Sequence, residues 1–316
     1  MQIVGASGQL NTDGYGAEDE VVNLEEQLAG WTGPSSATEQ EKQDRTERMI
    51  RDAVKAHVPF KDVDLDVYAK GSYANNTNVK ADSDVDIAVQ CGEACYWGEE
   101  KDGAHPPSTS YGGIWTPSKL RSELQAALEA KFPDQVDSSG STAFRINSSS
   151  ARVDADVVPC FDYRYYFSGG SYREGARVFK KDESTLENYP QQQLTNGRAK
   201  NNRTGARYKK TVRILKRVEN AMVESGNHDE VPSYFMECLV YNVPDHILQQ
   251  GTWTATVRDS IIHIWNKLQG AEPTATDERW LEPNECKWLF TSAQPWTRAD
   301  GRDFVKAAWN YLGFAS

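Results

Sequence analysis

Residues 70–89 read KGSYANNTNVKADSDVDIAV, and this stretch decides the fold because it joins a glycine-containing turn to a strand with two aspartates. The alternating segment 63–68 before it is typical of a half-buried strand, so Gly71 and Ser72 lie where a strand turns into a short helix. Glycine lets the backbone approach a ligand closely. The N–H groups of such a turn, with the Ser72 hydroxyl, suit phosphate oxygens. The sequence therefore predicts a phosphate-binding turn at residues 71–72.

Four aspartates follow this turn on two predicted strands. Asp84 and Asp86 share one face of the strand 84–89, and Asp154 and Asp156 share one face of the strand 151–159, because side chains alternate along a strand. An isolated Asp-x-Asp pair is more often part of a solvated sheet face, but here a phosphate turn precedes it. Two divalent cations need at least three carboxylates on a rigid support. We expect a two-metal site made by Asp84, Asp86 and one of Asp154 or Asp156; the spacing does not choose between the last two.

The composition limits the partners of the chain. A net charge of −11 over 316 residues argues against nucleic acid or an anionic membrane as the main partner, but is compatible with small anionic substrates bridged by Mg²⁺. The five cysteines contain no CxxC pair, which fits free thiols in a reducing compartment. The sequence has neither a signal-peptide pattern nor an apolar run long enough to span a bilayer, so we expect a cytoplasmic protein with no membrane association.

The chain divides into three parts by pattern, and the predicted fold class is α+β. Residues 1–34 are rich in Gly, Ser, Asn and acidic residues and are expected to form a flexible extension. Residues 35–190 hold the strands, with helices over 37–56 and 117–131 and a surface loop over 91–115; we call them the sheet lobe. Residues 191–316 show helical periodicity, with a buried stripe from Tyr208 to Met222, and form the helical lobe.

These motifs resemble those of a known family. Gly71-Ser72, Asp84-x-Asp86 and an Asp directly before Val157-Val158-Pro159 are similar to the polymerase-β-type nucleotidyltransferases. In detail the chain resembles the CD-NTases, the cyclic-oligonucleotide synthases of bacterial anti-phage (CBASS) defence that are related to animal cGAS and oligoadenylate synthetase. The resemblance is to their clade E, which carries stretches like GSYxNxTNxxxDSDVDxxVQ, NYP, AKN, WYKxTIRxxK and PSYFxECLxYNVPD. Their counterparts lie at residues 71–90, 188–190, 199–201, 208–216 and 232–245, within a resemblance that covers roughly residues 40–312.

The resemblance implies a polymerase-β-like sheet lobe, a helical C-terminal lobe and an active site in the cleft between them. It implies that Asp84, Asp86 and Asp156 bind two Mg²⁺ ions, which Mn²⁺ can replace, and that Asp156 also assists deprotonation of the attacking hydroxyl. Asp154 then becomes a neighbouring, supporting residue. The nucleotide-binding residues that the resemblance implies are Gly71, Ser72, Asn188, Lys209, Lys216, Ser233 and Tyr234.

Some of these residues also have a structural interpretation. A basic line such as Lys209, Arg213 and Lys216 is usually a solvated helix face, and a tyrosine such as Tyr234 often packs in a core rather than stacking on a base. Asn188 precedes Tyr-Pro, where it could cap its own backbone. Its amide can equally read the edge of a uracil, and in clade E an Asn here goes with incorporation of uridine.

The implied activity is the joining of two nucleoside triphosphates, UTP and ATP above all, with release of pyrophosphate. The product is a uridine-containing cyclic dinucleotide, c-di-UMP or cyclic UMP-AMP, that activates an anti-phage effector. The alternatives are a transferase making linear oligonucleotides or modifying a macromolecule, a purine-only synthase, or a nucleotide sensor without turnover. The chain has neither a zinc-thumb cluster nor a basic surface, so we expect no direct nucleic-acid activator, and we expect a monomer.

Overall fold

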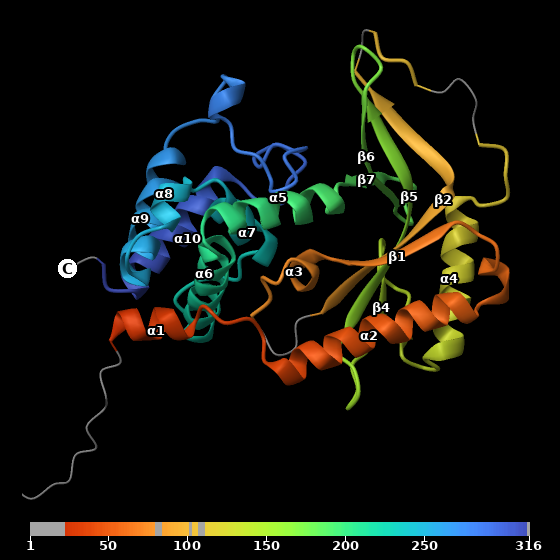
Figure 1. The fold of residues 1–316 in the computed structure, drawn as a ribbon, viewed down its shortest axis with the longest axis horizontal. Coiled ribbons are helices and arrows are strands. Elements are labelled where there is room, and N and C mark those ends of the chain that lie inside the picture. Colours follow the sequence, from red (N-terminus) through yellow and green to blue (C-terminus); the bar gives the residue numbers. More distant parts are fainter. Residues whose placement is uncertain (1–22, 80–83, 101–102, 107–110, 315–316) are drawn as a thin grey trace, which may run out of the picture.

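The computed structural model describes residues 23–79, 84–100, 103–106 and 111–314 (Figure 1). The chain forms a sheet lobe and a helical lobe that lie side by side. Helix α5 leads from the last strand into the helical lobe, so the two lobes meet along the site that carries the predicted residues. This arrangement confirms the predicted α+β class with a helical C-terminal lobe.

A mixed sheet organises the first lobe, with β2 and β5 at its centre. These two strands run parallel, whereas the other pairings are antiparallel. The order is β1-β2-β5-β4-β3, and β6 pairs with the second half of β5 and with β7. The strands are β1 Leu65–Lys70, β2 Val85–Glu99, β3 Val136–Asp137, β4 Phe144–Ile146, β5 Ala155–Tyr166, β6 Tyr172–Phe179 and β7 Thr185–Asn188.

Two helices cover one face of this sheet. Helix α2 (Ala37–Ala56) begins at a Ser36 capping box, and α4 (Pro117–Lys131) begins at a Thr116 cap; both helices have the predicted bounds. Both pack on a core that includes Val85, Ile87 and Val157. Because side chains alternate along a strand, burial of these residues turns Asp86 and Asp156 to the opposite face, toward the helical lobe.

The helical lobe is packed around α6 (Arg207–Glu224). The predicted stripe on α6, from Tyr208 through Val212 and Leu215 to Met222, is fully buried in the core of this lobe. The described part of the chain contains no helix that is long and apolar enough to cross a membrane. The other helical elements are α1 Leu24–Gly30, η1 Val58–Phe60, α3 Gly71–Ala74, α5 Pro190–Arg203, α7 Ser233–Tyr241, α8 Asp245–Leu248, α9 Trp253–Lys267, η2 Thr276–Glu278 and α10 Arg298–Tyr311.

The structure corrects two expectations about order along the chain. Residues 1–22 lie outside the described residues, but α1 is not part of a flexible extension: Leu28 is buried in the helical core, and Glu25 accepts hydrogen bonds from the N-terminus of α9. Residues 91–99 are not a loop, because β2 continues alongside β5 past an irregularity between Cys91 and Cys95. That irregularity, typical of a β-bulge, broke the sequence periodicity on which the prediction rested.

The anchoring of α1 can be tested by stability. Leu28→Ala should lower the free energy of unfolding by about 2–5 kcal/mol, because it removes a fully buried side chain from the helical core. Glu26→Ala, on the exposed side of α1, is the control and should change it by less than about 0.5 kcal/mol. Urea unfolding measures both. Equal, small effects would show that α1 is not anchored.

Candidate active site

The centre of the site is set by the register of β2 and β5. Asp86 lies directly beside Asp156 across this parallel pair, and Lys70 lies beside Asp86 on the other side. Asp84 immediately precedes β2, where the Val85 N–H donates to the Asp154 carbonyl at 3.0 Å. The sheet pairing therefore brings Asp84 and Asp86 together with Asp156, which is distant from them in sequence.

The turn at Gly71 lies against this row of carboxylates. Gly71 has a φ of +70°, and a Cβ atom there would clash with the Asp86 carboxylate, so only glycine fits. The Asn75 N–H donates to the Gly71 carbonyl at 3.1 Å and the Thr77 N–H to the Ser72 carbonyl at 2.9 Å. The predicted turn into a short helix is confirmed, and it places Ser72 next to the carboxylate strand.

Two cationic side chains flank the aspartates. The Lys70 ammonium lies 3.3 Å from Asp86 Oδ1, and the Arg145 guanidinium on β4 lies 3.7 Å from Asp84 Oδ2. Arg145 also forms a 2.7 Å ion pair with Asp154, which accepts a further hydrogen bond from the Ser148 N–H. Asp154 is thus held by an ion pair with Arg145 and a hydrogen bond from the Ser148 backbone.

The pKa shifts of the aspartates follow from these surroundings. Burial, and then repulsion from Asp86 and Asp84, raises the pKa of Asp156. Burial likewise raises the pKa of Asp84, against the opposing effect of Arg145. Burial also acts on Asp154, but hydrogen bonds from Arg145 and Ser148 outweigh it and lower the pKa of this carboxyl. After burial, repulsion from the neighbouring carboxylates is therefore the largest influence on the pKa of Asp156.

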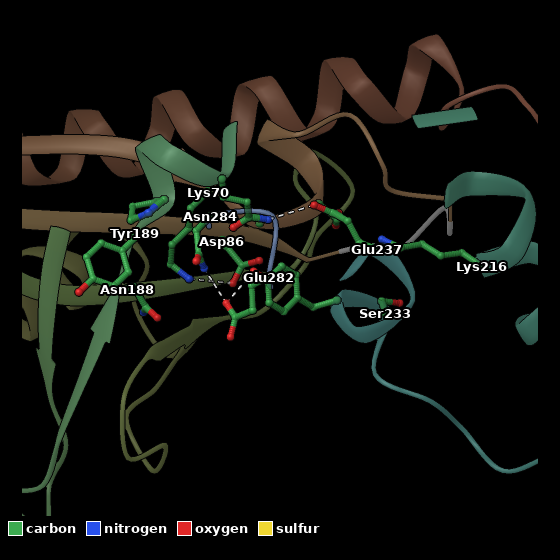
Figure 2. Close-up of a pocket in the computed structure, with 14 residues that line it drawn as sticks. Lys70, Asp86, Asn188, Tyr189, Lys216, Ser233, Glu237, Glu282 and Asn284 are labelled. Atoms are coloured by element: carbon green, nitrogen blue, oxygen red, sulfur yellow. Dashed lines mark hydrogen bonds and ion pairs between the residues drawn. The ribbon is translucent and has the colours of Figure 1, made fainter. Parts of the chain in front are cut away.

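A cavity of about 300 Å³ opens beside Asp86, between the two lobes (Figure 2). The sheet lobe contributes the Gly71-Ser72 turn and Asn188, and the helical lobe contributes Lys216, Ser233 and Tyr234. Sequence reasoning missed the remaining lining residues, which are Lys70, Tyr189, Pro190, Gln193, Glu237, Glu282 and Asn284. The cavity thus brings together six of the seven predicted nucleotide-binding residues.

The helical wall of the cavity carries one buried cation. Lys216 is only 2% exposed, and among the described residues no hydrogen bond or ion pair holds its ammonium group. Figure 2 shows it extending from α6 toward Glu237 on α7. Burial lowers the pKa of Lys216, while the charge of Glu237 acts to raise it. A buried ammonium that faces a cavity is suited to an anionic ligand.

Tyr234 is fixed on the same wall by a buried carboxylate. Its hydroxyl donates to Glu282 at 3.0 Å, and Glu282 also accepts from Asn284 at 2.6 Å and Gln294 at 2.5 Å. The Tyr234 ring also makes an edge contact with Trp296. Tyr234 therefore lines the cavity with a fixed ring, and it also packs against the core of the helical lobe.

Asn188 ends β7 at the rim of the cavity, opposite Ala176 of β6. Among the described residues, no hydrogen bond occupies its side-chain amide, so the backbone-capping interpretation finds no support here. The amide is available to a ligand.

The predicted basic line on α6 consists of three residues with different surroundings, Lys209, Arg213 and Lys216. Arg213 is buried rather than solvated: it donates to the Thr32 carbonyl and to the Asn76 carbonyl, both at 2.6 Å, and so connects the two lobes. Lys209 is half-buried, and its ammonium does not line the cavity. Only Lys216 of the three faces the site.

The described residues contain no group of three His, Cys, Asp or Glu side chains already arranged around a metal position. Asp84 and Asp86 instead turn toward Arg145 and Lys70, whose charges partly offset theirs. The set still fits hard divalent cations in kind, because three carboxylates lie on adjoining strands and repel one another.

Comparison with known proteins defines the class. Residues 47–116 match a nucleotidyltransferase domain, and residues 195–313 match the cGAS/DncV-like nucleotidyltransferase C-terminal helical domain. The chain is 33% identical over 294 residues to the cyclic dipyrimidine nucleotide synthase CdnE of Cecembia lonarensis, covering 92% of this chain and 98% of that protein. The chain is therefore a nucleotidyltransferase of the CD-NTase class.

Solved structures agree with this class. The Elizabethkingia meningoseptica CdnE cyclic dinucleotide synthase with GTP and Apcpp superposes with a TM-score of 0.75 at 32% identity, covering 92% and 98% of the two chains. The Rhodothermus marinus CdnE c-UMP-AMP synthase with Apcpp and Upnpp gives a TM-score of 0.79 at 26% identity, covering 92% and 97%. Within the CD-NTases, the chain belongs to the CdnE family, which confirms the resemblance to clade E.

The opposite pKa shifts of two nearby aspartates predict opposite effects on stability. A raised pKa makes the charged form of Asp156 unfavourable at pH 7, so Asp156→Asn should raise the Tm of the metal-free protein; the gain should fade as the pH drops toward about 4. Asp154 has a lowered pKa and is the matched control: Asp154→Asn should lower the Tm at pH 7. Calorimetry in EDTA measures both, and shifts of the same sign would contradict the electrostatic account.

Proposed function

We propose that this chain is a cyclic dinucleotide synthase that joins two nucleoside triphosphates, releases pyrophosphate and includes at least one UMP in its product. The observation that carries the proposal is the pairing of Asp86 with Asp156 beside a cavity lined from both lobes. The product would serve as a second messenger for an anti-phage effector.

Asp84, Asp86 and Asp156 would hold two Mg²⁺ ions, with Mn²⁺ able to replace them. When bound, such ions neutralise the charge that develops on the α-phosphate and on the leaving pyrophosphate. Lys70 pairs with Asp86 and Arg145 with Asp84 in the metal-free protein, so these two aspartates would turn away from their partners to receive metal.

Other side chains at the site would bind the phosphates and accept a proton. The turn at Gly71 and Ser72 would bind the donor phosphates from the sheet lobe, and Lys216 with Ser233 would bind them from the helical lobe. Asp156, which lies beside Asp86 in the sheet, would also assist deprotonation of the attacking ribose hydroxyl.

Two residues would act on the bases. Tyr234 would stack on a base, because its ring is fixed by Glu282 and Trp296 at the cavity wall. Asn188 would read a uracil edge, since its amide supplies both a donor and an acceptor. Lys209 would contribute at most indirectly, because its ammonium lies outside the cavity lining.

The activity is tested by incubation with the four labelled nucleoside triphosphates and Mg²⁺. We expect a phosphatase-resistant product, and we expect Asp84→Asn combined with Asp86→Asn to reduce its formation by at least about 10³-fold. Asp52→Asn, an exposed aspartate on α2, is the control and should leave the rate unchanged. A phosphatase-sensitive product would favour a linear or macromolecule-directed transferase, and tight binding without turnover would favour a sensor.

The choice of base is tested separately at Asn188. Asn188→Ala should reduce the preference for UTP over ATP by roughly 10-fold or more, because one good bidentate contact contributes about 1–3 kcal/mol of discrimination. Thr185→Ala, at the exposed start of the same strand, is the control. Competition between labelled UTP and ATP gives the ratio. An unchanged ratio in Asn188→Ala would remove the assignment, and a product containing only purines would contradict the uridine proposal.

A further inference from the structure

The side chain of Glu237 is the buried carboxylate that joins the two lobes at the cavity. Glu237 lies on α7 and is only 1% exposed. Its oxygens accept hydrogen bonds from Asn75 Nδ2 at 2.6 Å, from Thr77 Oγ1 at 2.8 Å and from Gln193 Nε2 at 3.1 Å. All three donors are neutral side chains, and Glu237 lines the cavity (Figure 2).

Two of these donors belong to the segment that shapes the phosphate turn. Asn75 and Thr77 follow the turn directly, and their backbone N–H groups donate to the carbonyls of Gly71 and Ser72. The same two residues therefore hold the turn through their backbones and Glu237 through their side chains. A displacement of Glu237 would be transmitted to the turn through two residues.

The contact is closely packed as well as hydrogen-bonded. Gly197 lies inside α5, where glycine costs about 1 kcal/mol relative to alanine. A Cβ atom at this position would lie 2.9 Å from Asn75 Oδ1. A helix-interior glycine thus leaves the space in which Asn75 reaches Glu237.

Glu237 also acts on the charge of Lys216, which lines the helical side of the cavity with it. Lys216 is buried, and burial disfavours its ammonium form; Glu237 is the largest influence in favour of that form. Arg213 opposes it, while Cys238 and Glu219 favour it less strongly than Glu237 does. Glu237 therefore holds the segment after the turn by hydrogen bonds, and its charge favours the ammonium form of Lys216.

We propose that Glu237 is a positioning residue that locks the turn at Gly71 and Ser72 to α7 of the helical lobe, so that the two halves of the triphosphate site keep a fixed separation. The identity of the ligand rests on the proposed function, but the lock itself does not. Glu237 acts through the turn and through Lys216.

The first test is the hydrogen exchange of the turn. Glu237→Gln replaces one acceptor oxygen by an NH₂ group, which cannot accept from Asn75 or Thr77. Amides of residues 72–79 should exchange about tenfold faster, since an unsatisfied buried donor costs about 1–3 kcal/mol. Glu224→Gln, exposed on α6, is the control and should leave exchange unchanged. Unchanged exchange at residues 72–79, or equally faster exchange throughout the chain, would overturn the proposal.

The second test is the binding of α,β-methylene-ATP with Mg²⁺, measured by calorimetry. Glu237→Gln should raise the Kd of the analogue by about tenfold. As the pH is raised, the variant should lose the analogue at a lower pH than the wild type does, because Lys216 loses its proton more readily without the carboxylate. A purely structural role would leave the pH profile unmoved, and that result would overturn the effect on Lys216. If the wild-type protein does not bind the analogue, the proposed function is wrong. The hydrogen-exchange measurement then tests by itself whether Glu237 holds the turn.

A milder variant covers the case in which Glu237→Gln does not fold. Thr77→Val keeps the side-chain shape and removes one donor to Glu237. It should accelerate exchange at residues 72–79 in the same way, with a smaller effect. In the double variant the two effects should be less than additive, because they remove the same contact. Full additivity would contradict the proposed lock.

Discussion

The structure depends on the parallel pairing of β2 and β5, which holds Asp86 directly beside Asp156. Like charges at this spacing repel, and burial adds to the cost, as the raised pKa of Asp156 indicates. The sheet tolerates the repulsion because Val85, Ile87 and Val157 are buried on its other face under α2 and α4. The hydrophobic face therefore fixes the register, and the register concentrates the negative charge on which the proposed metal binding depends.

The second condition for a site is a fixed relation between the lobes. Arg213 donates to carbonyls in both the segment after α1 and the loop after the phosphate turn. Glu237 accepts from that loop and from α5. These polar contacts lie around the cavity, whereas each lobe has its own apolar core. The cavity is thus shaped by directional contacts, whose geometry is more specific than that of apolar packing.

Local patterns in the sequence predicted the parts of the fold that local rules determine. The bounds of α4, the buried stripe of α6 and the turn at Gly71 all follow from short-range periodicity or backbone preference. The length of β2 could not be predicted in this way, since it depends on pairing with β5 across a bulge.

In the candidate site, too, local sequence patterns predicted some residues and could not predict others. The aspartates carry a recognisable spacing, whereas Glu237 and Glu282 are single carboxylates in helical or loop sequence that only tertiary contacts bring to the cavity. The burial of Arg213 was missed because its partners are backbone carbonyls far away in sequence, which leave no pattern. A glutamate within an otherwise apolar helix, as at Glu237 in α7, is the signal that could have indicated a buried polar contact.

The most direct test of the central claim is the anomalous scattering of Mn²⁺ in crystals of the wild-type protein soaked with Mn²⁺ and a non-hydrolysable UTP analogue. The account predicts manganese peaks among Asp84, Asp86 and Asp156, with the triphosphate between Ser72 and Lys216. Manganese bound elsewhere, with none of these three carboxylates as a ligand, would contradict it.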